Sequence, residues 1–552
     1  MKKNIALRIL SVVLVFAMLV CAIPMTAITA FAAESDGTES TVEPEKVLTP
    51  AEAVEKEMAE RSTITKDRSQ IKDGSEAAVY NNGKLHAEGS FSEMWKVALE
   101  LAEYVKTDKD HSNTGKSGTV EFVLNKDLVY DKTVLGKSDM TVSNQKITID
   151  LNGHILSRST SGSVISVDKG AVLTIMDSAP AHKNAGNIEK YGVWKAKSNG
   201  STVIPGGVIT GGDSSLGGAL YIVGKSTVYM TGGTIAGNKA IMGSAVCMTD
   251  NSTLDMSRGN SQICYNYCAN WMMDGGTVFM DGHCSVIGGY IHHNLVDDYG
   301  GGIRVRGNAN TIKDVVIYAN KAEEYGGGLY IERWNTGETT TISGCKIIEN
   351  YAGEDGGGVY VYNPYLIDMS DTWVENNVAG DEGGGICLSD WTGTDLKISG
   401  RMIVRNNYES NEVKSDLYLE GDDDLIVGTL SLGSEIWIKT EIPAAKYNGV
   451  DKTLLEAQTG TSHLFFFADE EGYCVKYQDD PAKDNYRRMY LAEGTRAEDA
   501  TKVLTDYATK QQETPYKVES GEYKNETFPL YKGYFEYILM STTDFYSVSP
   551  FY

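Results

Sequence analysis

The sequence predicts an all-β fold, a parallel β-helix solenoid, and three observations support this prediction. Seven asparagines recur at spacings of 26 to 30 residues. Most are followed by a short turn, a glycine cluster and a brief apolar strand. The repeated unit has no helical periodicity, and a period of this length then indicates short strands stacked coil upon coil. The asparagines are Asn238, Asn266, Asn294, Asn320, Asn350, Asn377 and Asn407.

We interpret this asparagine column as structural, because stacked Asn side chains can hydrogen-bond from one coil to the next. The apolar triplets after the glycines are expected to alternate, with aliphatic residues inward and the middle residue outward. The middle residues include five aromatic rings that are candidates for stacking on sugars. The alternative is that the rings only stiffen the sheet. They are Tyr221, Phe279, Tyr330, Tyr360 and Tyr418.

The repeats resemble those of a known family. An (I/V)xxN element followed by GG(A/G)(I/L/V) is similar to the polymorphic membrane protein repeat, and more broadly to right-handed, pectin-lyase-like β-helices of secreted bacterial surface proteins. The copies include residues 235–238, 317–320 and 347–350, and the glycine element occurs at 217–220. The family usually has Phe where this chain has Ile or Val. The resemblance covers about residues 206–420. It implies a fold, and adhesins, binding scaffolds and enzymes all carry such repeats.

The chain begins with a predicted secretory signal peptide at 1–33, with three basic residues, an apolar core and an Ala-Phe-Ala cleavage site. Its removal takes the net charge from −25 to −25 − 3 = −28. Such a charge disfavours nucleic acid as a partner and favours an extracellular or cell-envelope location. No later run is long and apolar enough to predict a transmembrane segment. Seven cysteines remain after Cys21 is lost, and their odd number and irregular spacing predict no disulfide framework.

The remaining chain divides into four predicted parts. Residues 34–88 form an acidic linker with one short helix after the Thr49-Pro50-Ala51-Glu52 capping box. Residues 89–117 contain a capping helix that covers the N-terminal end of the solenoid. The β-helix spans 118–440, with a loop insertion near 179–199 that leaves the stack. Residues 441–552 form a small β-rich cap, with a hairpin at 463–477, and an aromatic tail.

An acidic column precedes the glycine clusters and is the candidate cation site. Carboxylates on neighbouring coils would lie ~4.8 Å apart and repel one another unless water or a cation lies between them. Ca²⁺ accepts several carboxylate ligands, so calcium is the cation that this column suggests, and no other cofactor is expected. The alternative is a solvated turn without a cation. The candidate ligands are Asp297, Asp298, Glu323, Glu324, Glu354, Asp355, Asp381 and Glu382.

The predicted function is a secreted or surface scaffold for adhesion or glycan binding, with an extracellular glycan or a surface protein as partner. The first alternative is a polysaccharide lyase or glycoside hydrolase, which would need converging carboxylates. Asp297, Asp298 and Glu323 would form such a group, and Arg304 is a basic residue near them. A structural envelope protein is the third possibility.

Overall fold

The structure is a computed structural model that describes residues 48–61, 65–114, 116, 118–135, 140–269, 275–307, 309–332, 338–362, 366–389, 395–419, 424–440, 455–458, 463–479, 486–494, 516–517 and 527–528. The expected signal peptide and most of the aromatic tail lie outside these residues. Residues 50–552 form one compact unit, to which the following description applies.

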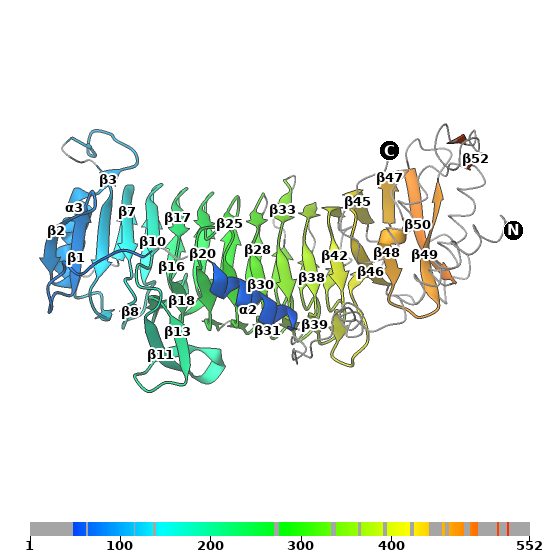
Figure 1. Ribbon diagram of the computed structural model, residues 1–552, viewed down its shortest axis with the longest axis horizontal. Coiled ribbons are helices and arrows are strands. Elements are labelled where there is room, and N and C mark those ends of the chain that lie inside the picture. The colour runs from blue at the N-terminus through cyan, green and yellow to red at the C-terminus, as the bar shows by residue number, and fades with distance from the viewer. Residues whose placement is uncertain are drawn as a thin grey trace, which may run out of the picture. The chain divides into compact units, whose positions relative to one another are not determined.

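The unit is built around a parallel β-helix of about 11 turns, so the predicted fold class is confirmed (Figure 1). A regular coil contains four strands, which we name by position: post-glycine, second, pre-asparagine and post-asparagine. In one coil these are β28 (Ile303–Arg306), β29 (Thr311–Lys313), β30 (Val316–Tyr318) and β31 (Lys321–Ala322). Each pairs in parallel with its equivalent one coil later, as with Ile317 and Ile347.

The same four positions recur along the regular coils. The other post-glycine strands are β16 (Leu220–Ile222), β20 (Val246–Thr249), β24 (Val278–Asp281), β32 (Leu329–Glu332), β36 (Val359–Tyr362), β40 (Ile386–Ser389) and β44 (Leu417–Leu419). The other second strands are β17 (Thr227–Met230), β21 (Thr253–Asp255), β25 (Ser285–Ile287), β33 (Thr340–Ser343), β37 (Ile367–Ser370), β41 (Asp395–Gly400) and β45 (Asp424–Leu430).

The remaining two positions surround the asparagine. The other pre-asparagine strands are β14 (Val208–Thr210), β18 (Thr234–Ala236), β22 (Gln262–Cys264), β26 (Tyr290–His292), β34 (Lys346–Ile348), β38 (Trp373–Glu375), β42 (Ile403–Arg405) and β46 (Glu435–Thr440). The other post-asparagine strands are β15 (Asp213–Leu216), β19 (Lys239–Met242), β23 (Tyr267–Cys268), β27 (Leu295–Val296), β35 (Tyr351–Ala352), β39 (Val378–Ala379) and β43 (Tyr408–Glu409).

One continuous hydrophobic core runs inside the coils. Ile303, Val305, Ile312 and Ile317 show how one coil contributes, because all four are fully buried in that core. They come from the two ends of the post-glycine triplet and from the middle of the next two strands. This is the period-2 alternation that stacked strands require.

The asparagines bind one another along the whole column. Asn350 donates from its backbone N–H and its Nδ2 to Asn377 Oδ1, at 2.9 and 3.0 Å. Its own Oδ1 accepts the same two bonds from Asn320, and its Nδ2 also donates to Ile317 O. The seven asparagines are 0–2% exposed. We call this column the asparagine ladder.

The ladder also accounts for the left-handed backbone conformation of the residue just before each asparagine. Ala319 and Glu349 have φ of 52° and 53°, and Asn376 has φ of 58°. A side chain in this region costs roughly 1–2 kcal/mol. The buried amide bonds of the following asparagine hold the backbone in that conformation and offset the cost.

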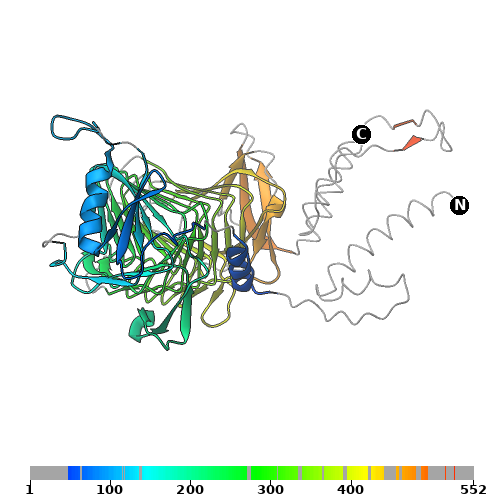
Figure 2. The ribbon, with the colours of Figure 1, turned by 60° about the vertical axis from the view of Figure 1, so that its left-hand side comes forward.

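Helix α3 (Phe91–Leu101) covers the N-terminal end of the core (Figure 2). Phe91, Met94, Trp95 and Ala98 are buried in it, and the Trp95 ring meets Phe122 edge-on at 5.3 Å. Ser90 is the N-cap residue of this helix but makes no side-chain bond to a helix N–H. Glu76 accepts the free N–H of Phe91 instead, at 2.9 Å.

The first coils lie next to this helix and are less regular. Their strands are β3 (Glu103–Tyr104), β4 (Val120–Leu124), β5 (Leu128–Tyr130), β6 (Met140–Ser143), β7 (Gln145–Asp150), β8 (Ile155–Arg158), β9 (Ile165–Asp168) and β10 (Val172–Met176). After β10 the chain leaves the stack as β11 (Lys183–Ile188), β12 (Trp194–Ala196) and β13 (Thr202–Pro205). These three strands form a separate antiparallel sheet that projects from the coils (Figure 1).

The region expected to be a linker is more ordered than the sequence suggested. Helix α2 (Pro50–Glu60) begins at the predicted proline and buries Val54 against Tyr290, Val316, Tyr318 and Ile348. Strands β1 (Ala77–Asn81) and β2 (Lys84–Gly89) form a hairpin, and β1 pairs antiparallel with β4. The Asn82-Gly83 dipeptide at their turn is a hairpin signal that the linker interpretation overlooked.

The C-terminal end also differs from expectation in its pairing. The strands here are β47 (Leu455–Gln458), β48 (Phe466–Ala468), β49 (Tyr473–Asp479), β50 (Tyr486–Glu493), β51 (Tyr516–Lys517) and β52 (Thr527–Phe528). The predicted 463–477 hairpin is wrong, because β48 pairs in parallel with β46 and β49 pairs antiparallel with β50. No helix among the described residues is long and apolar enough to cross a membrane.

Replacing one asparagine of the ladder should destabilise the solenoid strongly. Asn350→Ala removes the acceptor of two buried donors of Asn320 and leaves Ile317 O without its amide partner. Each orphaned buried group costs about 1–3 kcal/mol, so we expect a loss of ~3 kcal/mol or more. Urea unfolding of the mature chain measures it. Asn411→Ala, at an exposed turn, is the control and should change stability by less than about 0.5 kcal/mol. Equal effects of the two variants would contradict the role of the ladder.

Candidate functional site

The turns between the post-asparagine and post-glycine strands stack in register and form an acidic edge of the solenoid. Backbone bonds join Glu324 N to Asp298 O, Glu354 N to Glu324 O and Asp381 N to Glu354 O, at 2.9–3.2 Å. Asp298, Glu324, Glu354 and Asp381 therefore occupy one column, which we call the acidic edge. Four carboxylates on consecutive coils concentrate negative charge along it.

The residue after each of these acids forms a second column, and its chemistry changes along the solenoid. The register places Tyr299, Tyr325, Asp355 and Glu382 in it, as the bonds Gly300 N to Tyr325 O and Gly356 N to Glu382 O show. We call this the mixed column. It presents two tyrosines on the earlier coils and two carboxylates on the later ones.

The acidic pairs that the sequence analysis treats as equivalent are therefore shifted by one position between the earlier and the later coils. The copies DDYGGG and EEYGGG have a tyrosine before the glycines, whereas EDGGG and DEGGG have an acid there. Aligning on the glycines separates Asp297 and Glu323 from the acidic edge and puts Asp355 and Glu382 in the mixed column. The alignment also reveals Tyr299 and Tyr325, which the sequence analysis missed.

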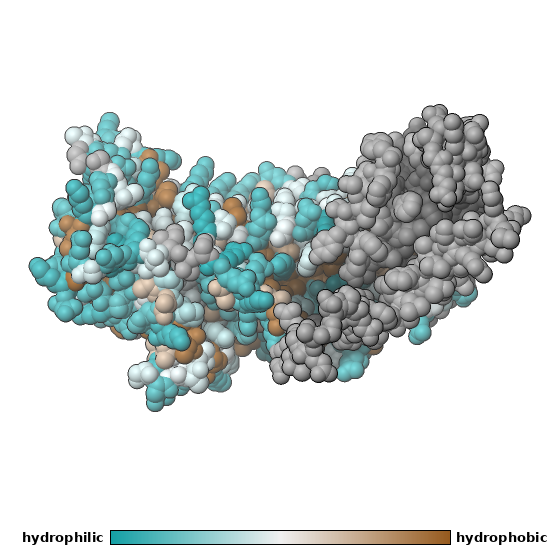
Figure 3. All heavy atoms as spheres, in the orientation of Figure 1, coloured by the Kyte–Doolittle hydropathy of each residue, from teal (hydrophilic) through white to brown (hydrophobic). Residues whose placement is uncertain are grey.

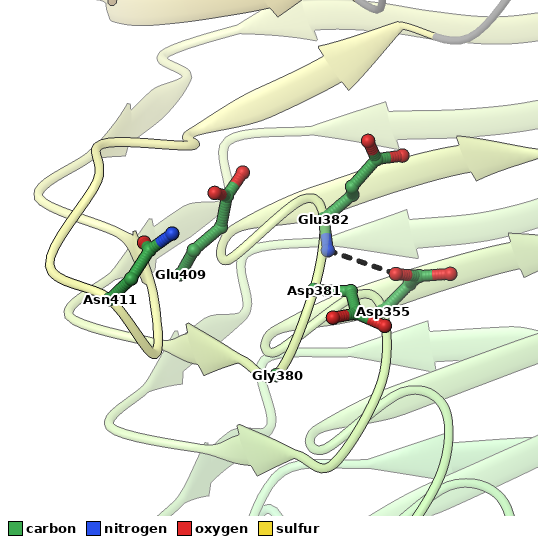
Figure 4. A pocket seen from close by; sticks show the side chains of 6 residues that line it. All are labelled: Asp355, Gly380, Asp381, Glu382, Glu409 and Asn411. Carbon is green, nitrogen blue, oxygen red and sulfur yellow. Dashed lines mark hydrogen bonds between the residues drawn. The ribbon is translucent and has the colours of Figure 1, made fainter.

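A cleft of about 440 Å³ opens where the mixed column becomes acidic (Figure 4). Its lining residues are Asp355, Gly380, Asp381, Glu382, Glu409 and Asn411. The Glu382 N–H donates to Asp355 Oδ1 at 2.9 Å, and Glu409 pairs with Lys439.

The charges of this region act on one another. The pKa of Asp355 is raised to about 6. Burial is the largest cause, and the charges of Glu382, Asp381 and Glu354 act in the same direction, whereas the hydrogen bond from Glu382 N–H lowers it. The pKa of Glu324 is also raised, first by burial and then by Asp298 and Glu354. Both groups would ionise more readily beside a cation or a hydrogen-bond donor.

The three carboxylates proposed for catalysis do not converge on the cleft. Asp297 accepts a bond from the Tyr267 hydroxyl at 2.7 Å, and Glu323 pairs with Lys321 at 2.9 Å. None of Asp297, Asp298 and Glu323 lines the cleft. Over the part of the chain that the structure describes, no three His, Cys, Asp or Glu side chains are grouped to hold a metal ion.

The predicted aromatic column is aligned but covered. Tyr330 and Tyr360 stack at 5.6 Å, in register with Cys387 and Tyr418. Phe279, Tyr330, Tyr360 and Tyr418 are only 1–8% exposed, and Tyr221 is half-buried. The expectation of an exposed row of five rings is therefore wrong for four of them.

The covering rings are those of the mixed column. Tyr299 stacks on Tyr330 at 4.7 Å, and Tyr325 lies 4.7 Å from Tyr360. Tyr299 and Tyr325 are 5.6 Å apart and partly exposed. The outward rings thus form two layers, of which the mixed column supplies the solvent-facing one.

Arg304 interrupts the aromatic column and is part of its packing. It is 2% exposed, pairs with Glu332 at 2.5 Å, and lies 5.2 and 5.3 Å from the rings of Tyr299 and Tyr330. A buried, ion-paired guanidinium is poorly placed to remove a proton from a polysaccharide. This arrangement argues against Arg304 as the base of a lyase.

The two adjacent histidines of β26 and its turn lie against Tyr318, which belongs to the cluster that packs on helix α2. His292 Nδ1 lies 2.8 Å from His293 Nδ1, and the His292 ring stacks on Tyr318 at 4.6 Å. Burial lowers the pKa of both histidines, and His293 lowers that of His292 further. Their environment is that of a packed interface beside a helix. The molecular surface on this side is mostly hydrophilic, with separate apolar patches (Figure 3).

No protein-family model matches the chain, and neither a curated protein nor a solved structure matches it. The class is therefore defined by the structure itself. It is a parallel β-helix with a covered aromatic column and an edge that combines tyrosines with carboxylates.

Removing the charge of Asp355 should stabilise the protein at neutral pH. The pKa of Asp355 is higher in the folded than in the unfolded chain. Its contribution to the free energy of unfolding is therefore full below about pH 4 and is lost as pH rises through about 6. Asp355→Asn keeps the acceptor for Glu382 N–H, so we expect it to be more stable than wild type at pH 7.5 by about 1 kcal/mol after solvent screening, and equal at pH 4.

Urea unfolding at both pH values measures this difference. Asp110→Asn, at an exposed site that is distant in sequence from Asp355, is the matched control. A variant no more stable than wild type at pH 7.5 would show that the charges around Asp355 do not oppose one another.

Proposed function

We propose that this protein is an extracellular scaffold that binds a hydroxyl-rich, uncharged glycan along the acidic edge and the mixed column. The observation that carries the proposal is the pair of partly exposed tyrosines, Tyr299 and Tyr325, set 5.6 Å apart beside a continuous row of carboxylates. Aromatic rings stack on sugar faces, and carboxylate oxygens accept bonds from sugar hydroxyls.

Charge narrows the glycan class. The formal net charge of −25 and the four carboxylates of the acidic edge would repel an acidic polysaccharide. Such a ligand would need a bridging cation, and Ca²⁺ is the one that several carboxylates and an extracellular setting favour. We therefore propose calcium only as a bridge at the cleft, where oxygens of the glycan would have to complete a coordination set that Asp355, Asp381 and Glu382 do not form by themselves.

Two further features support an extracellular surface role. The sequence of 1–33 has the charge and apolar pattern of a secretory signal. The (I/V)xxN and GG repeats resemble right-handed, pectin-lyase-like surface proteins and the polymorphic membrane protein family. A protein ligand at the cell surface and a structural role in the envelope are the outcomes to expect if no glycan binds.

The proposal predicts that the two exposed tyrosines determine glycan affinity. The Tyr299→Ala/Tyr325→Ala double variant should bind about tenfold more weakly, since each ring contributes about 0.5–1.5 kcal/mol. Native gels cast with neutral α- and β-glucans, and with polygalacturonate, measure the retardation of the mature protein. Each gel is run with calcium and with a chelator.

Two matched variants serve as controls. Tyr229→Ala, on the second strand β17, removes a partly exposed tyrosine from another face and should not change retardation. Tyr299→Phe keeps the ring and its stacking on Tyr330. Retardation that the double variant leaves unchanged would contradict the site, and no retardation on any glucan would contradict the proposed function.

A glycoside hydrolase is the second candidate, and Asp355 is the observation that favours it. Its pKa of about 6 suits a general acid, and Asp381, Glu382 and Glu409 provide further carboxylates around the same cleft. This assignment replaces the earlier one to Asp297, Asp298 and Glu323.

Under this candidate, wild-type protein should release reducing ends from a neutral polysaccharide at a pH near 6. Asp355→Asn should reduce the rate by about 10²-fold or more while retardation in the gel persists. A reducing-end assay on the glucans used for the gels measures it. Absence of reducing ends with wild type would reject the hydrolase and leave the scaffold.

A further inference from the structure

The asparagine ladder ends in two acids instead of a further asparagine. Asn407 donates its backbone N–H and its Nδ2 to Asp416 Oδ1, both at 2.7 Å. Asp416 N–H then donates to Asp469 Oδ2 at 2.9 Å. Asn407 makes to Asp416 the two bonds that one asparagine makes to the next, and the Asp416 N–H makes the backbone bond of the pair to Asp469. The side chains of Asp416 and Asp469 therefore continue the hydrogen bonding of the ladder, although Asp416 itself precedes β44 in the register of Gly385.

An acid at these positions lacks the donor that each asparagine supplies. In the ladder, Nδ2 of one residue donates to Oδ1 of the next, as Asn377 does to Asn407 at 2.9 Å. Asp416 has an oxygen in place of that amide nitrogen. Among the described residues, none donates a hydrogen bond to Asp416 Oδ2 or Asp469 Oδ1, which are both buried, and Asp416 as a whole is fully buried. Two such buried carboxyl groups, held together by the bond from Asp416 N–H to Asp469 Oδ2, would be costly if both were ionised.

The neighbouring cations are engaged elsewhere. Lys439 pairs with Glu409, and Lys414 lies 4.2 Å from the Trp437 ring. Both lysines lower the pKa of Asp469 through their charge, but burial outweighs them. In the part of the chain that the structure describes, the charged groups around the pair are Lys414 on the connection before Asp416, Lys439 on β46 and Glu409 on β43. None of these three supplies the missing donor.

We propose that Asp416 and Asp469 share one proton, and that this proton closes the C-terminal end of the asparagine ladder and makes that end sensitive to pH. The protonated carboxyl takes the place of the missing amide N–H and donates to the other acid. When the proton leaves, two buried negative charges face each other, and the segment from β48 to Asp469 loosens from Asp416.

The direction of the pH dependence follows from linkage. Burial, and then the charge of Asp469, raises the pKa of Asp416 to about 8. An acid with a raised folded pKa contributes stability that is full below its unfolded value near 4 and is lost as pH rises through about 8. The C-terminal end should therefore be closed at pH 6 and open above pH 9, while the ladder from Asn238 to Asn377 has no titrating group.

Hydrogen exchange of the full mature chain at pH 6 and 9.5, corrected for the intrinsic exchange rate, tests the proposal. Protection of the amides of Asp416 and Asp469 should fall by tenfold or more in wild type, and that of Asn320 and Asn350 should not change. Asp416→Asn restores the amide donor, so its protection should be independent of pH. Glu412→Gln, an exposed acid of the same segment, is the control and should behave as wild type.

Each other outcome would overturn the proposal. An Asp416→Asn variant that loses protection at pH 9.5 as wild type does would show that the pair does not titrate. Protection at pH 9.5 that requires calcium and disappears with chelator would assign the pair to a cation. Asp469→Asn supplies the same donor from the other side, so it repeats the test if the first variant does not fold.

Discussion

The hydrogen bonds that asparagine side chains accept from the preceding coil determine the geometry of this solenoid. Each Oδ1 accepts a backbone N–H and an amide N–H of the preceding asparagine, and each Nδ2 donates to a carbonyl of the preceding coil. This pattern sets the stacking register at one point of every coil. The left-handed turn before the asparagine, the post-asparagine strand and the acidic turn after it then stack in the same register. The acidic edge exists because the ladder holds neighbouring turns within hydrogen-bonding distance.

The surface chemistry of the edge depends on which residue type each coil places in the mixed column. On the earlier coils Tyr299 and Tyr325 cover the inner rings. On the later coils Asp355 and Glu382 take the same position, and like charges accumulate around a cleft. The same position of the coil therefore holds a stacking tyrosine on the earlier coils and a charged carboxylate on the later ones. A ligand that spans it would meet aromatic rings at one end and carboxylates at the other.

The sequence predicted the repeat, the core alternation and the N-terminal cap, because each depends on local patterns of period and apolar spacing. It did not predict which outward rings are exposed. Burial of Tyr330 and Tyr360 depends on Tyr299 and Tyr325, which lie on the preceding turns, and this is a contact between coils that spacing alone does not show. The register of the acidic pairs failed for a related reason, since EDGGG and EEYGGG differ by one residue before the glycines. The docking of α2 beside β26, β30 and β34 joins residues almost three hundred positions apart, and no local signal indicates it.

Helix α2 gives the solenoid an unusual mechanical connection. In a stacked array each coil normally contacts only its neighbours, so stability is close to a sum of nearest-neighbour contributions and unfolding can begin at either end. Here one helix contacts three consecutive coils, through Tyr290, Tyr318 and Ile348, and Glu57 pairs with Lys346 at 2.9 Å. The chain between α2 and the first coil therefore closes a long loop across the repeats. Unravelling that starts at the N-terminal cap would have to release this tie before it could pass the middle coils, which makes those coils a single cooperative block.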